Sequence, residues 1–432
     1  MARKMKDSGI EWIGEIPEGW ETINPKALFA QRKDRASKGE RQLTSSQQYG
    51  ILYQDEYMEL TGSKVVTVEK DFDILKHVEA GDFVISMRSF QGGLEYSTKS
   101  GAISSAYVML VPNLELVYPR FYRWLLKSSV YIDALQRTTN MVRDGQAMRY
   151  SNFAQVRLFI LPLDEQKSRA DFLDVKCSSI DKMLSKTRSS IEEYKKLKQA
   201  VITQAVTKGV RGKREMKDSG VEWIGEIPVE WNITKIKSGV TKIGSGKTPS
   251  GGAETYTDSG VIFLRSQNVY DCTLNLESPT YISHEVDATM KSTRVLPDDV
   301  LLNITGGSIG RCSIVPKTLG LANVNQHVCI IRTNPLIFLP KYMQYFWVSA
   351  LGHLAIDLYQ TGGNREGMSA DAIRNTPIPY APLKEQKEIT AYLDTKCAEI
   401  DGLIVKKEQL VKELESYKKS LIYEVVTGKR EV

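Results

Sequence analysis

Polar loops, most of which contain glycine, interrupt the β-rich stretches in both halves of the sequence. In the second half they read GSGKTP (244–249), RSQN (265–268), TGGSIGR (305–311), NVNQ (323–326) and TGGNR (361–365). In the first half they read TSSQQY (44–49), RSFQGG (88–93) and RDGQAMRY (143–150). Arg, Gln, Asn, Ser and Thr side chains hydrogen-bond to base edges and phosphates, and glycine lets the backbone approach a ligand closely. The loops therefore predict contact with nucleic acid, although polar loops are also the ordinary connection between strands.

The residues that we predict to contact DNA are mainly the long polar side chains of these loops. They are Arg88, Gln91, Arg143, Gln146, Arg149, Lys247, Thr248, Arg265, Gln267, Thr305, Arg311, Gln326 and Arg365.

No combination of residues predicts catalysis. The GSGKT stretch resembles part of a phosphate-binding P-loop, but that motif needs glycine where Thr241 stands. The pairs Asp298/Asp299 and Glu192/Glu193 precede a strand or lie on a helix face, where we expect them to be solvated. The spacing suggests no Ser/His/Asp or Cys/His set, and the sequence has neither a CxxC pair nor an HExxH motif. We therefore expect no catalytic residue and no metal site.

Composition and charge indicate a globular protein of more than one domain. The 432 residues include 58 basic and 52 acidic side chains, a net charge of +6, and are 41% hydrophobic. The length predicts two or three domains. No apolar run reaches the ~18 residues of a membrane span, and the first residues lack the apolar stretch of a signal peptide. Five scattered cysteines indicate a reducing compartment, so we expect a cytoplasmic protein without membrane contact.

The sequence contains an internal duplication. MKDSGIEWIGEIP (5–17) and MKDSGVEWIGEIP (216–228) are identical at 12 of 13 positions. LPLDEQKSRADFLDVKCSSID (161–181) and APLKEQKEITAYLDTKCAEID (381–401) form a second repeated pair. GKRE runs into MKDSG in mid-chain, GKRE also stands at 428–431, and MKDSG stands at 5–9. We therefore expect a circular arrangement with pseudo-two-fold symmetry and neighbouring termini.

The repeated segments also predict two long helices. Apolar positions recur every three or four residues from 173 to 205 and from 393 to 425, and no proline interrupts either run. Each stripe would be on the order of 48 Å long, and the circular order favours an antiparallel coiled coil over two separate amphipathic helices. The predicted seam, which we also consider for partner binding, includes Leu173, Ile180, Leu184, Ile191, Leu393, Ile400, Ile404 and Val411. Thr187, Lys198, Lys407 and Lys418 also fall at seam positions, where polar groups can fix register.

The predicted fold class is α+β, with two mixed α/β domains separated by the two long helices. We predict a first domain at 1–160, the central helix and junction at 161–215, a second domain at 216–380 and the C-terminal helix at 381–432. One helix is expected in each domain, at 119–136 and at 340–359, and each opens at a proline. The central segment holds 13 basic and 8 acidic residues, whereas both domains are nearly neutral. Attraction to phosphates alone is therefore expected to be modest, so a partner would supply part of the affinity.

The layout and the motifs resemble the specificity subunit of type I restriction–modification systems. The doubled SGxEWIGEIPxxW (8–20 and 219–231), PLxEQ (162–166 and 382–386) and LDxKCxxID (173–181 and 393–401) carry the resemblance. GKTP (246–249) and GGSIGR (306–311) add to it, whereas the first domain lacks both of these.

The resemblance implies a non-catalytic subunit with two target recognition domains. Each domain would recognise one half of a two-part asymmetric site in double-stranded DNA, and the helices would set the spacer and dock two methyltransferase (modification) subunits. Two restriction subunits, which are translocases and nucleases, would join the complex in a bacterial or archaeal cytoplasm. The chain itself would hold no cofactor, since its partners use S-adenosylmethionine, ATP and Mg²⁺. The alternatives are a protein-interaction scaffold and an enzyme in its own right, and the missing catalytic motifs argue against the enzyme.

Overall fold

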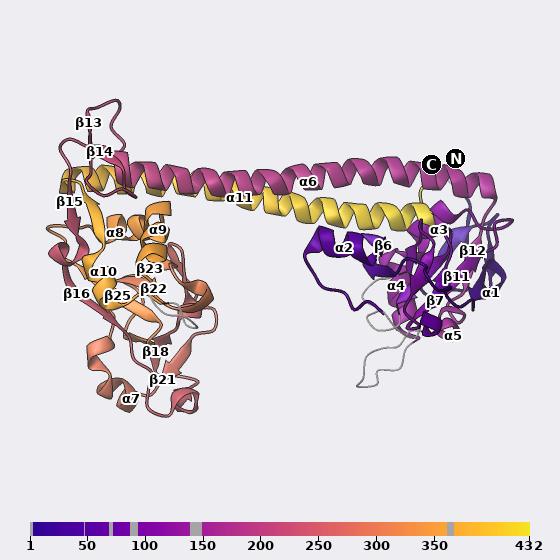
Figure 1. Ribbon diagram of the computed structural model, residues 1–432, viewed down its shortest axis with the longest axis horizontal. Coiled ribbons are helices and arrows are strands. Elements are labelled where there is room, and N and C mark those ends of the chain that lie inside the picture. The colour runs from indigo at the N-terminus through magenta and orange to yellow at the C-terminus, as the bar shows by residue number, and fades with distance from the viewer. Residues whose placement is uncertain (1–2, 47, 69–71, 87–93, 139–148, 361–366) are drawn as a thin grey trace. The chain divides into compact units, whose positions relative to one another are not determined.

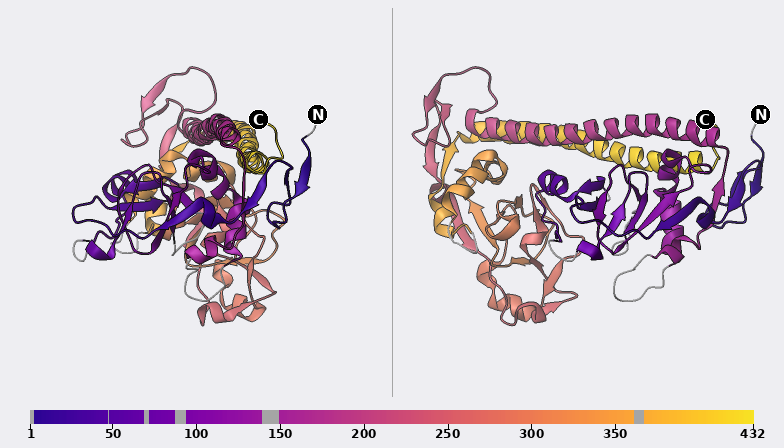
Figure 2. Two further views of the ribbon diagram at one scale, coloured as in Figure 1. Left: turned by 90° about the vertical axis from the view of Figure 1, so that its right-hand side faces the viewer. Right: turned by 45° about the vertical axis from the view of Figure 1, so that its right-hand side comes forward.

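Two long helices dominate the fold. A computed structural model describes residues 3–46, 48–68, 72–86, 94–138, 149–360 and 367–432 (Figure 1). Helix α6 spans Leu163–Lys208 and helix α11 spans Leu383–Val426, each beginning directly after a proline. They lie side by side in every view (Figures 1 and 2). No helix among these residues is long and apolar enough to cross a membrane.

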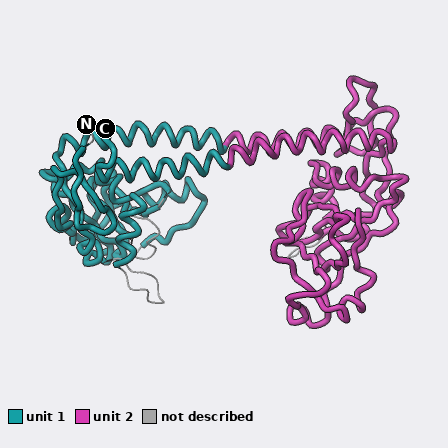
Figure 3. The backbone as a smooth tube through the Cα atoms, turned by 180° about the vertical axis from the view of Figure 1, so that it is seen from behind, with its two compact units in different colours: residues 1–188, 409–432 teal, residues 189–408 magenta. Residues whose placement is uncertain are grey.

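The chain divides into two compact units, and each unit contains part of both long helices. Unit 1 contains residues 1–188 and 409–432, and unit 2 contains residues 189–408 (Figure 3). Each unit therefore holds the first half of one long helix and the last half of the other. The repeat offset of 220 residues maps the helix segments of one unit onto those of the other, as expected for a circular duplication.

Unit 1 is built around a four-stranded antiparallel sheet in the order β4-β11-β8-β9. The pairs β1-β2, β3-β12, β5-β6 and β7-β10 complete its strands. The strands are β1 Met5–Asp7, β2 Glu15–Pro17, β3 Glu21–Ile23, β4 Phe29–Arg32, β5 Leu43–Ser46, β6 Gly50–Tyr53, β7 Lys76–Val78, β8 Phe83–Ser86, β9 Leu94–Tyr96, β10 Gly101–Ile103, β11 Tyr107–Pro112 and β12 Leu158–Ile160. The helices are α1 Pro25–Leu28, α2 Gln54–Thr61, α3 Pro119–Leu126, α4 Ser129–Gln136 and α5 Tyr150–Phe153.

Unit 2 repeats this plan and adds a second four-stranded sheet. Its order β16-β25-β22-β23 matches the sheet of unit 1, and β17-β21-β18-β24 lies beside it. The strands are β13 Met216–Asp218, β14 Glu226–Pro228, β15 Asn232–Lys235, β16 Val240–Ser245, β17 Tyr256–Thr257, β18 Val261–Leu264, β19 Val269–Tyr270, β20 Thr273–Leu274, β21 Thr280–Ile282, β22 Val300–Asn303, β23 Cys312–Ile314, β24 Ala322–Val324, β25 Val328–Thr333 and β26 Pro377–Tyr380. The helices are α7 His284–Thr289, α8 Pro340–Val348, α9 Ala350–Tyr359 and α10 Ala370–Asn375.

The repeated tryptophan motif attaches to the first turn of the long helix in each unit. In unit 1 the buried Trp20 stacks on Phe159 and donates its indole N–H to Glu165 Oε2 at 3.1 Å. In unit 2 the buried Trp231 donates to Glu385 Oε2 at 2.9 Å. The repeated Trp and Glu are therefore two halves of one contact, although they are about 145–155 residues apart in the sequence.

The glutamine that follows each of these glutamates joins three segments of its domain. Gln166 is fully buried, donates to the carbonyls of Leu116 and Leu161 at 2.9 Å each, and accepts from the Tyr118 N–H at 2.7 Å. Gln386 makes the same three bonds in unit 2, to the carbonyls of residues 337 and 381 and from the N–H of residue 339. A buried amide satisfied at both ends fixes where the helix begins relative to the domain.

The apolar stripes of the two helices face each other within each unit. Leu173, Ile180, Leu184, Ile191, Leu393 and Ile400 are buried, and Ile404 and Val411 are half-buried. In unit 1 the first three pack with α11 residues such as Leu421 and Val425 in the main core. These side chains therefore meet the other helix, so a partner would contact other faces of the pair.

Two symmetric ion pairs cross the seam. Lys198 Nζ lies 2.7 Å from both carboxylate oxygens of Asp401 in unit 2, and Lys418 Nζ lies at the same distances from Asp181 in unit 1. The offset of 220 residues relates the two pairs. Partly exposed pairs contribute little stability, about 0–1 kcal/mol each, but they favour one antiparallel register over its neighbours. This agrees with the role expected for lysines at seam positions.

The prediction of one helix in each domain is wrong, because two consecutive short helices occupy each region. The first region is divided into α3 and α4, and the second into α8 and α9. A serine stands at each break. Ser349 Oγ accepts the N–H of Gly352 and so caps α9, while the Ser128 and Ser349 hydroxyls donate to carbonyls of the preceding turn. Serine competes for backbone groups in this way, which ends one helix and starts the next.

The predicted fold class is confirmed, with mixed α and β domains, paired antiparallel long helices and one sheet of the same strand order in both halves. In unit 1 the two ends of the chain lie close together. Arg3 and Arg169 both bind Glu165, and Arg169 donates to the Arg430 carbonyl at 3.0 Å. The predicted bounds of the domains stay a prediction, because the division into units cuts both long helices.

The Glu165 carboxylate should make the stability of the fold sensitive to acid. Burial alone would raise its pKa, but hydrogen bonds from Arg3, Arg169 and Trp20 outweigh burial and hold the pKa at about 2. A pKa below the unfolded value stabilises the fold above pH ~4.5, and this contribution is lost as the pH falls towards 2. Glu165→Gln should therefore lower the free energy of unfolding at pH 7 by about 2–3 kcal/mol and should weaken its dependence on pH between 5 and 2. Urea unfolding followed by tryptophan fluorescence at several pH values measures both effects.

The matched control is Glu193→Gln, which neutralises an exposed glutamate on the same helix. Equal pH profiles for the two variants would contradict a stabilising role of the Glu165 carboxylate.

Candidate nucleic-acid interface

The strand order of unit 2 brings four of the predicted loops to one edge. Strands β16 and β22 both pair antiparallel with β25, so their last residues lie beside the first residues of β25. Strand β18 runs parallel to β24, so these two strands end together, and β24 leads directly into β25. The loops after β16, β18, β22 and β24 therefore meet at one edge, although they span more than 80 residues of sequence.

Backbone hydrogen bonds join these loops. The Lys247 N–H donates to the Val324 carbonyl at 3.1 Å, and the Asn325 N–H donates to the Leu264 carbonyl at 3.0 Å. The Ile304 N–H donates to the carbonyl of residue 327 at 3.0 Å. Glycine is required at 246, because a Cβ there would overlap the carbonyl oxygens of residues 324 and 325. The GKTP loop is thus fixed against the turn between β24 and β25.

Asn303, the last residue of β22, connects two of the loops. Its side chain is fully buried, and Nδ2 donates to the Ser266 carbonyl at 2.8 Å and to Ser308 Oγ at 3.2 Å. One buried amide therefore holds the RSQN and TGGSIGR loops together. Sequence analysis missed this residue, because an asparagine at the end of a strand gives no signal of what it will contact.

Two arginines of the site lie over aromatic rings. The Arg265 guanidinium lies 5.6 Å from the centroid of Tyr256, and the Arg311 guanidinium lies 4.6 Å from that of Tyr270. Both side chains are half-buried. An aromatic face orients a guanidinium without using its N–H donors. Nε of Arg265 is buried, so its contact with a base or a phosphate would come from the terminal nitrogens.

Three adjacent polar groups form a hydrogen-bonded chain at the same edge. Thr305 Oγ1 lies 2.6 Å from His327 Nδ1, and His327 Nε2 lies 3.1 Å from Gln326 Nε2. Gln326 is exposed, and the other two are half-buried. Thr305 and Gln326 were predicted contacts, whereas His327 was missed, since a lone histidine carries no spacing signal.

The remaining predicted contacts divide between the same edge and other places. Lys247 and Gln267 are exposed and Thr248 is half-buried, all three on the converging loops of unit 2. Arg149 is exposed in unit 1, where its backbone N–H donates to Asn152 Oδ1 at the start of α5. Five predicted contacts lie outside the residues that the structure describes, namely Arg88, Gln91, Arg143, Gln146 and Arg365. The prediction of a loop at 44–49 is wrong in part, because its first three residues belong to β5.

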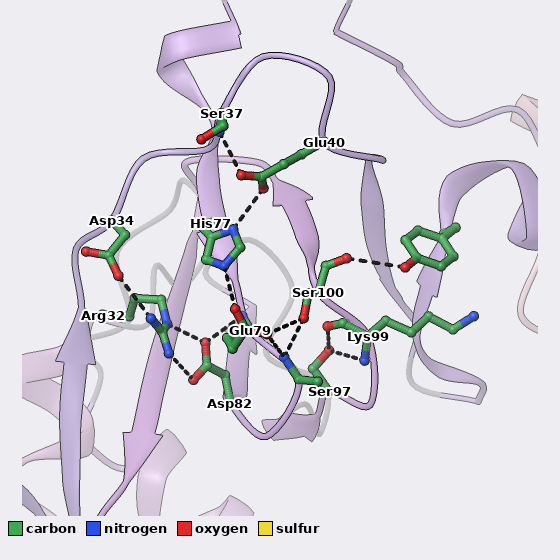
Figure 4. A network of polar contacts seen from close by, with 12 residues as sticks. Arg32, Asp34, Ser37, Glu40, His77, Glu79, Asp82, Ser97, Lys99 and Ser100 are labelled. Atoms are coloured by element: carbon green, nitrogen blue, oxygen red, sulfur yellow. Dashed lines mark hydrogen bonds and ion pairs between the residues drawn. The ribbon is translucent and has the colours of Figure 1, made fainter.

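A network of charged groups in unit 1 connects β4 and β7 with the residue before β8 (Figure 4). Arg32 Nε donates to Asp82 Oδ2 at 2.6 Å, and Asp82 stands directly before β8. The ring nitrogens of His77 lie 2.8 Å from Glu40 and 3.0 Å from Glu79. Burial lowers the pKa of His77, but the two carboxylates outweigh burial and raise it. Because these charged groups pair with one another, we assign this network a structural role.

One expected solvated carboxylate is buried. Asp299, which precedes β22, is 1% exposed and accepts from Arg332 Nε and Nη2 at 2.7 and 2.8 Å. The expectation for Asp299 was therefore wrong, because a bidentate guanidinium replaces the water that a lone carboxylate would need. Asp298, Glu192 and Glu193 are exposed as expected. Within the described ranges, no three His, Cys, Asp or Glu side chains are grouped to hold a metal ion.

Known proteins share both the sequence and the fold. The sequence model of the type I restriction modification DNA specificity domain matches residues 228–413. A Methanocaldococcus jannaschii protein, named as the MjaX specificity subunit of a type I restriction enzyme, is 23% identical over 96% of this chain and 95% of its own length. The MjaVIII specificity subunit of the same organism is 24% identical over 82% of this chain and 80% of its own. The chain is therefore similar to type I specificity subunits over most of its length.

Two solved structures share the fold of this chain. A chain from a study of assembly and conformational transition of the type I restriction–modification system superimposes with a TM-score of 0.74, at 14% identity over 96% of this chain and 99% of that one. The HsdS subunit of Thermoanaerobacter tengcongensis gives a TM-score of 0.52 at 14% identity, over 96% and 98% of the two chains. At such low identity the likeness concerns the fold alone.

The loop-bridging role of Asn303 can be tested by truncation. Asn303→Ala removes both donors and leaves the Ser266 carbonyl without this partner, so the free energy of unfolding of unit 2 should fall by about 1–3 kcal/mol. Amide hydrogen exchange should also become faster in residues 265–268 and 305–311.

Asn232→Ala, at an exposed position in the same unit, is the matched control and should leave both loops unchanged. Unchanged exchange in the Asn303 variant would show that the loops hold their positions without this side chain.

Proposed function

We propose that this chain is a specificity subunit that recognises DNA within a type I restriction–modification complex, with each domain contacting one half of a two-part asymmetric site. The observation that carries the proposal is the convergence of four polar loops at one edge of unit 2, with aromatic faces behind two of the arginines. Base readout requires several donors and acceptors held in one place, and this edge provides them. Because the two domains differ in their loops, the half-sites that they recognise should also differ.

The two long helices set the spacer between the half-sites in this proposal. Each of them is one uninterrupted helix, of 46 residues in α6 and 44 in α11, and the symmetric ion pairs support a single register. Exposed apolar side chains on their outer faces, which include Val175, Val405 and Tyr417, offer docking surfaces for two methyltransferase subunits.

In the same proposal the chain is non-catalytic and binds no cofactor. S-adenosylmethionine belongs to the two modification subunits, and ATP and Mg²⁺ belong to the two restriction subunits, all within the cytoplasm of a bacterium or archaeon. The low net charge of the two domains agrees with partner subunits that supply part of the affinity for DNA. A protein that binds DNA alone through phosphate contacts needs more positive charge.

Exchanging one domain tests the assignment of half-sites. Methylation sites are mapped by sequencing in the strain that carries the gene, and residues 22–160 are then replaced by the corresponding domain of another specificity subunit. One half of the methylated motif should change, while the other half and the spacer should stay the same.

Replacement of residues 233–376 is the matched experiment and should change the opposite half. If either exchange altered both halves, the separate assignment of the half-sites would be wrong, and an absence of any two-part motif would contradict the proposal as a whole.

Shortening both helices tests the spacer. Removing residues 187–193 of α6 and 407–413 of α11 takes one heptad from each helix on both sides of the symmetry centre and leaves the phase of the seam intact. Seven residues of helix span about 10 Å, so the spacer should shorten by roughly three base pairs. Methylation mapping measures the new spacer.

Deleting the heptad from α6 alone is the control, because it breaks the pairing of Lys198 with Asp401 and should abolish methylation. A functional double deletion with an unchanged spacer would contradict the role of the helices.

A further inference from the structure

In the structure the amide nitrogen of Gln326 faces the His327 ring, and this orientation assigns the protons of the chain Gln326–His327–Thr305. The amide nitrogen of Gln326 can only donate, so His327 Nε2, 3.1 Å away, must accept. The proton of the neutral ring therefore lies on Nδ1, and Nδ1–H donates to Thr305 Oγ1 at 2.6 Å. The Thr305 hydroxyl hydrogen is then free to point towards a ligand.

The backbone presents Gln326 at the tip of a tight turn. The Val328 N–H donates to the Asn325 carbonyl at 3.1 Å, and the His327 N–H donates to Asn325 Oδ1 at 3.2 Å. Asn325 is buried, whereas Gln326 is exposed between the ends of β24 and β25. The turn therefore anchors both neighbours of Gln326 and leaves its side chain as the part that reaches outward.

Because His327 accepts one N–H of Gln326, only the other polar groups of the amide can hydrogen-bond to DNA. A free glutamine side chain rotates and can turn its oxygen or its nitrogen towards a base. Once His327 binds one N–H, the outward groups are Oε1 and the second N–H, one acceptor beside one donor. Adenine presents the complementary pair in the major groove, its N6 amino donor and its N7 acceptor, whereas guanine presents two acceptors there.

We infer that Gln326 recognises an adenine in the half-site of the second domain and that His327 is the positioning residue that fixes the orientation of its amide. This inference rests on the proposed function. His327 contacts no base in this arrangement; it acts through Gln326 and, at its other nitrogen, through Thr305.

Base preference, and not affinity alone, tests the inference. Variants replace the chromosomal copy in the strain that carries the gene, and methylation is measured on plasmids in which each position of the half-site is varied. The wild-type chain should prefer adenine at one position of the second half-site. Gln326→Glu removes the N–H donor and leaves acceptors that suit the cytosine amino group, so the preference for adenine at that position should fall by roughly 5- to 150-fold, with cytosine gaining.

Two substitutions of His327 separate positioning from packing. His327→Phe keeps a ring of similar size but has no acceptor, so the preference for adenine should relax at that one position while the first half-site stays the same. His327→Gln supplies an amide oxygen that can accept the same N–H, so it should restore much of the preference. His284→Ala, at an exposed histidine of α7 in the same unit, is the matched control and should leave the motif unchanged.

The possible failures are distinguishable. A wild-type chain with no two-part motif would overturn the proposed function. An intact motif whose base preferences do not respond to Gln326→Glu, or which changes at a base other than adenine, would overturn the inference alone. Loss of methylation in His327→Phe at every sequence, with no change in relative base preference, would show a purely structural histidine and would also overturn it.

Discussion

The structure depends on a buried contact between a tryptophan and a glutamate at the start of each long helix. Trp20 and Trp231 are fully buried and donate to Glu165 and Glu385. A carboxylate taken out of water is costly unless donors surround it, so each glutamate requires both the indole and a nearby arginine, Arg3 or Arg214. Since these donors come from the segment that precedes each domain, the contact closes the domain onto its own helix.

This attachment of each domain to its helix explains which residues are duplicated in the two halves of the sequence. The glutamine beside each glutamate satisfies three backbone groups of its domain, and a tyrosine hydroxyl in each unit, Tyr122 or Tyr342, donates to the last strand before the long helix. None of these side chains belongs to the candidate interface. The duplicated motifs therefore preserve the attachment of a domain to a helix, and the loops between them are free to differ. Because the attachment and the loops use different residues, a change in the loops need not disturb the attachment.

The sequence alone predicted the parts of the molecule that are periodic or repeated. The long helices follow from the spacing of apolar residues over several turns. The seam positions of Lys198 and Lys418 follow from the same spacing, whereas their partners Asp401 and Asp181 were not predicted. Contacts that depend on strand order could not be predicted. Asn303 and His327 acquire their roles only because β22 and β24 both end beside β25, and neither residue lies in a motif.

Asp299 looked solvated because its partner, Arg332, is 33 residues away on a neighbouring strand. The breaks at Ser128 and Ser349 were missed for a different reason, since serine is tolerated inside helices and its capping role depends on local competition for backbone groups.

The two domains share one sheet order but present different chemistry at the corresponding edge. In unit 2 the turn before β25 carries Asn325, Gln326 and His327, whereas the turn before β11 in unit 1 carries Ser104, Ser105 and Ala106. Long amides can pair with a base through two hydrogen bonds, whereas short hydroxyls make one bond and reach less far. The same position in the fold would therefore read a base directly in one domain and leave that task to other loops in the other. In the proposed function an asymmetric DNA site would follow from a symmetric scaffold, because the symmetry lies in the buried attachment and the asymmetry in the exposed turns.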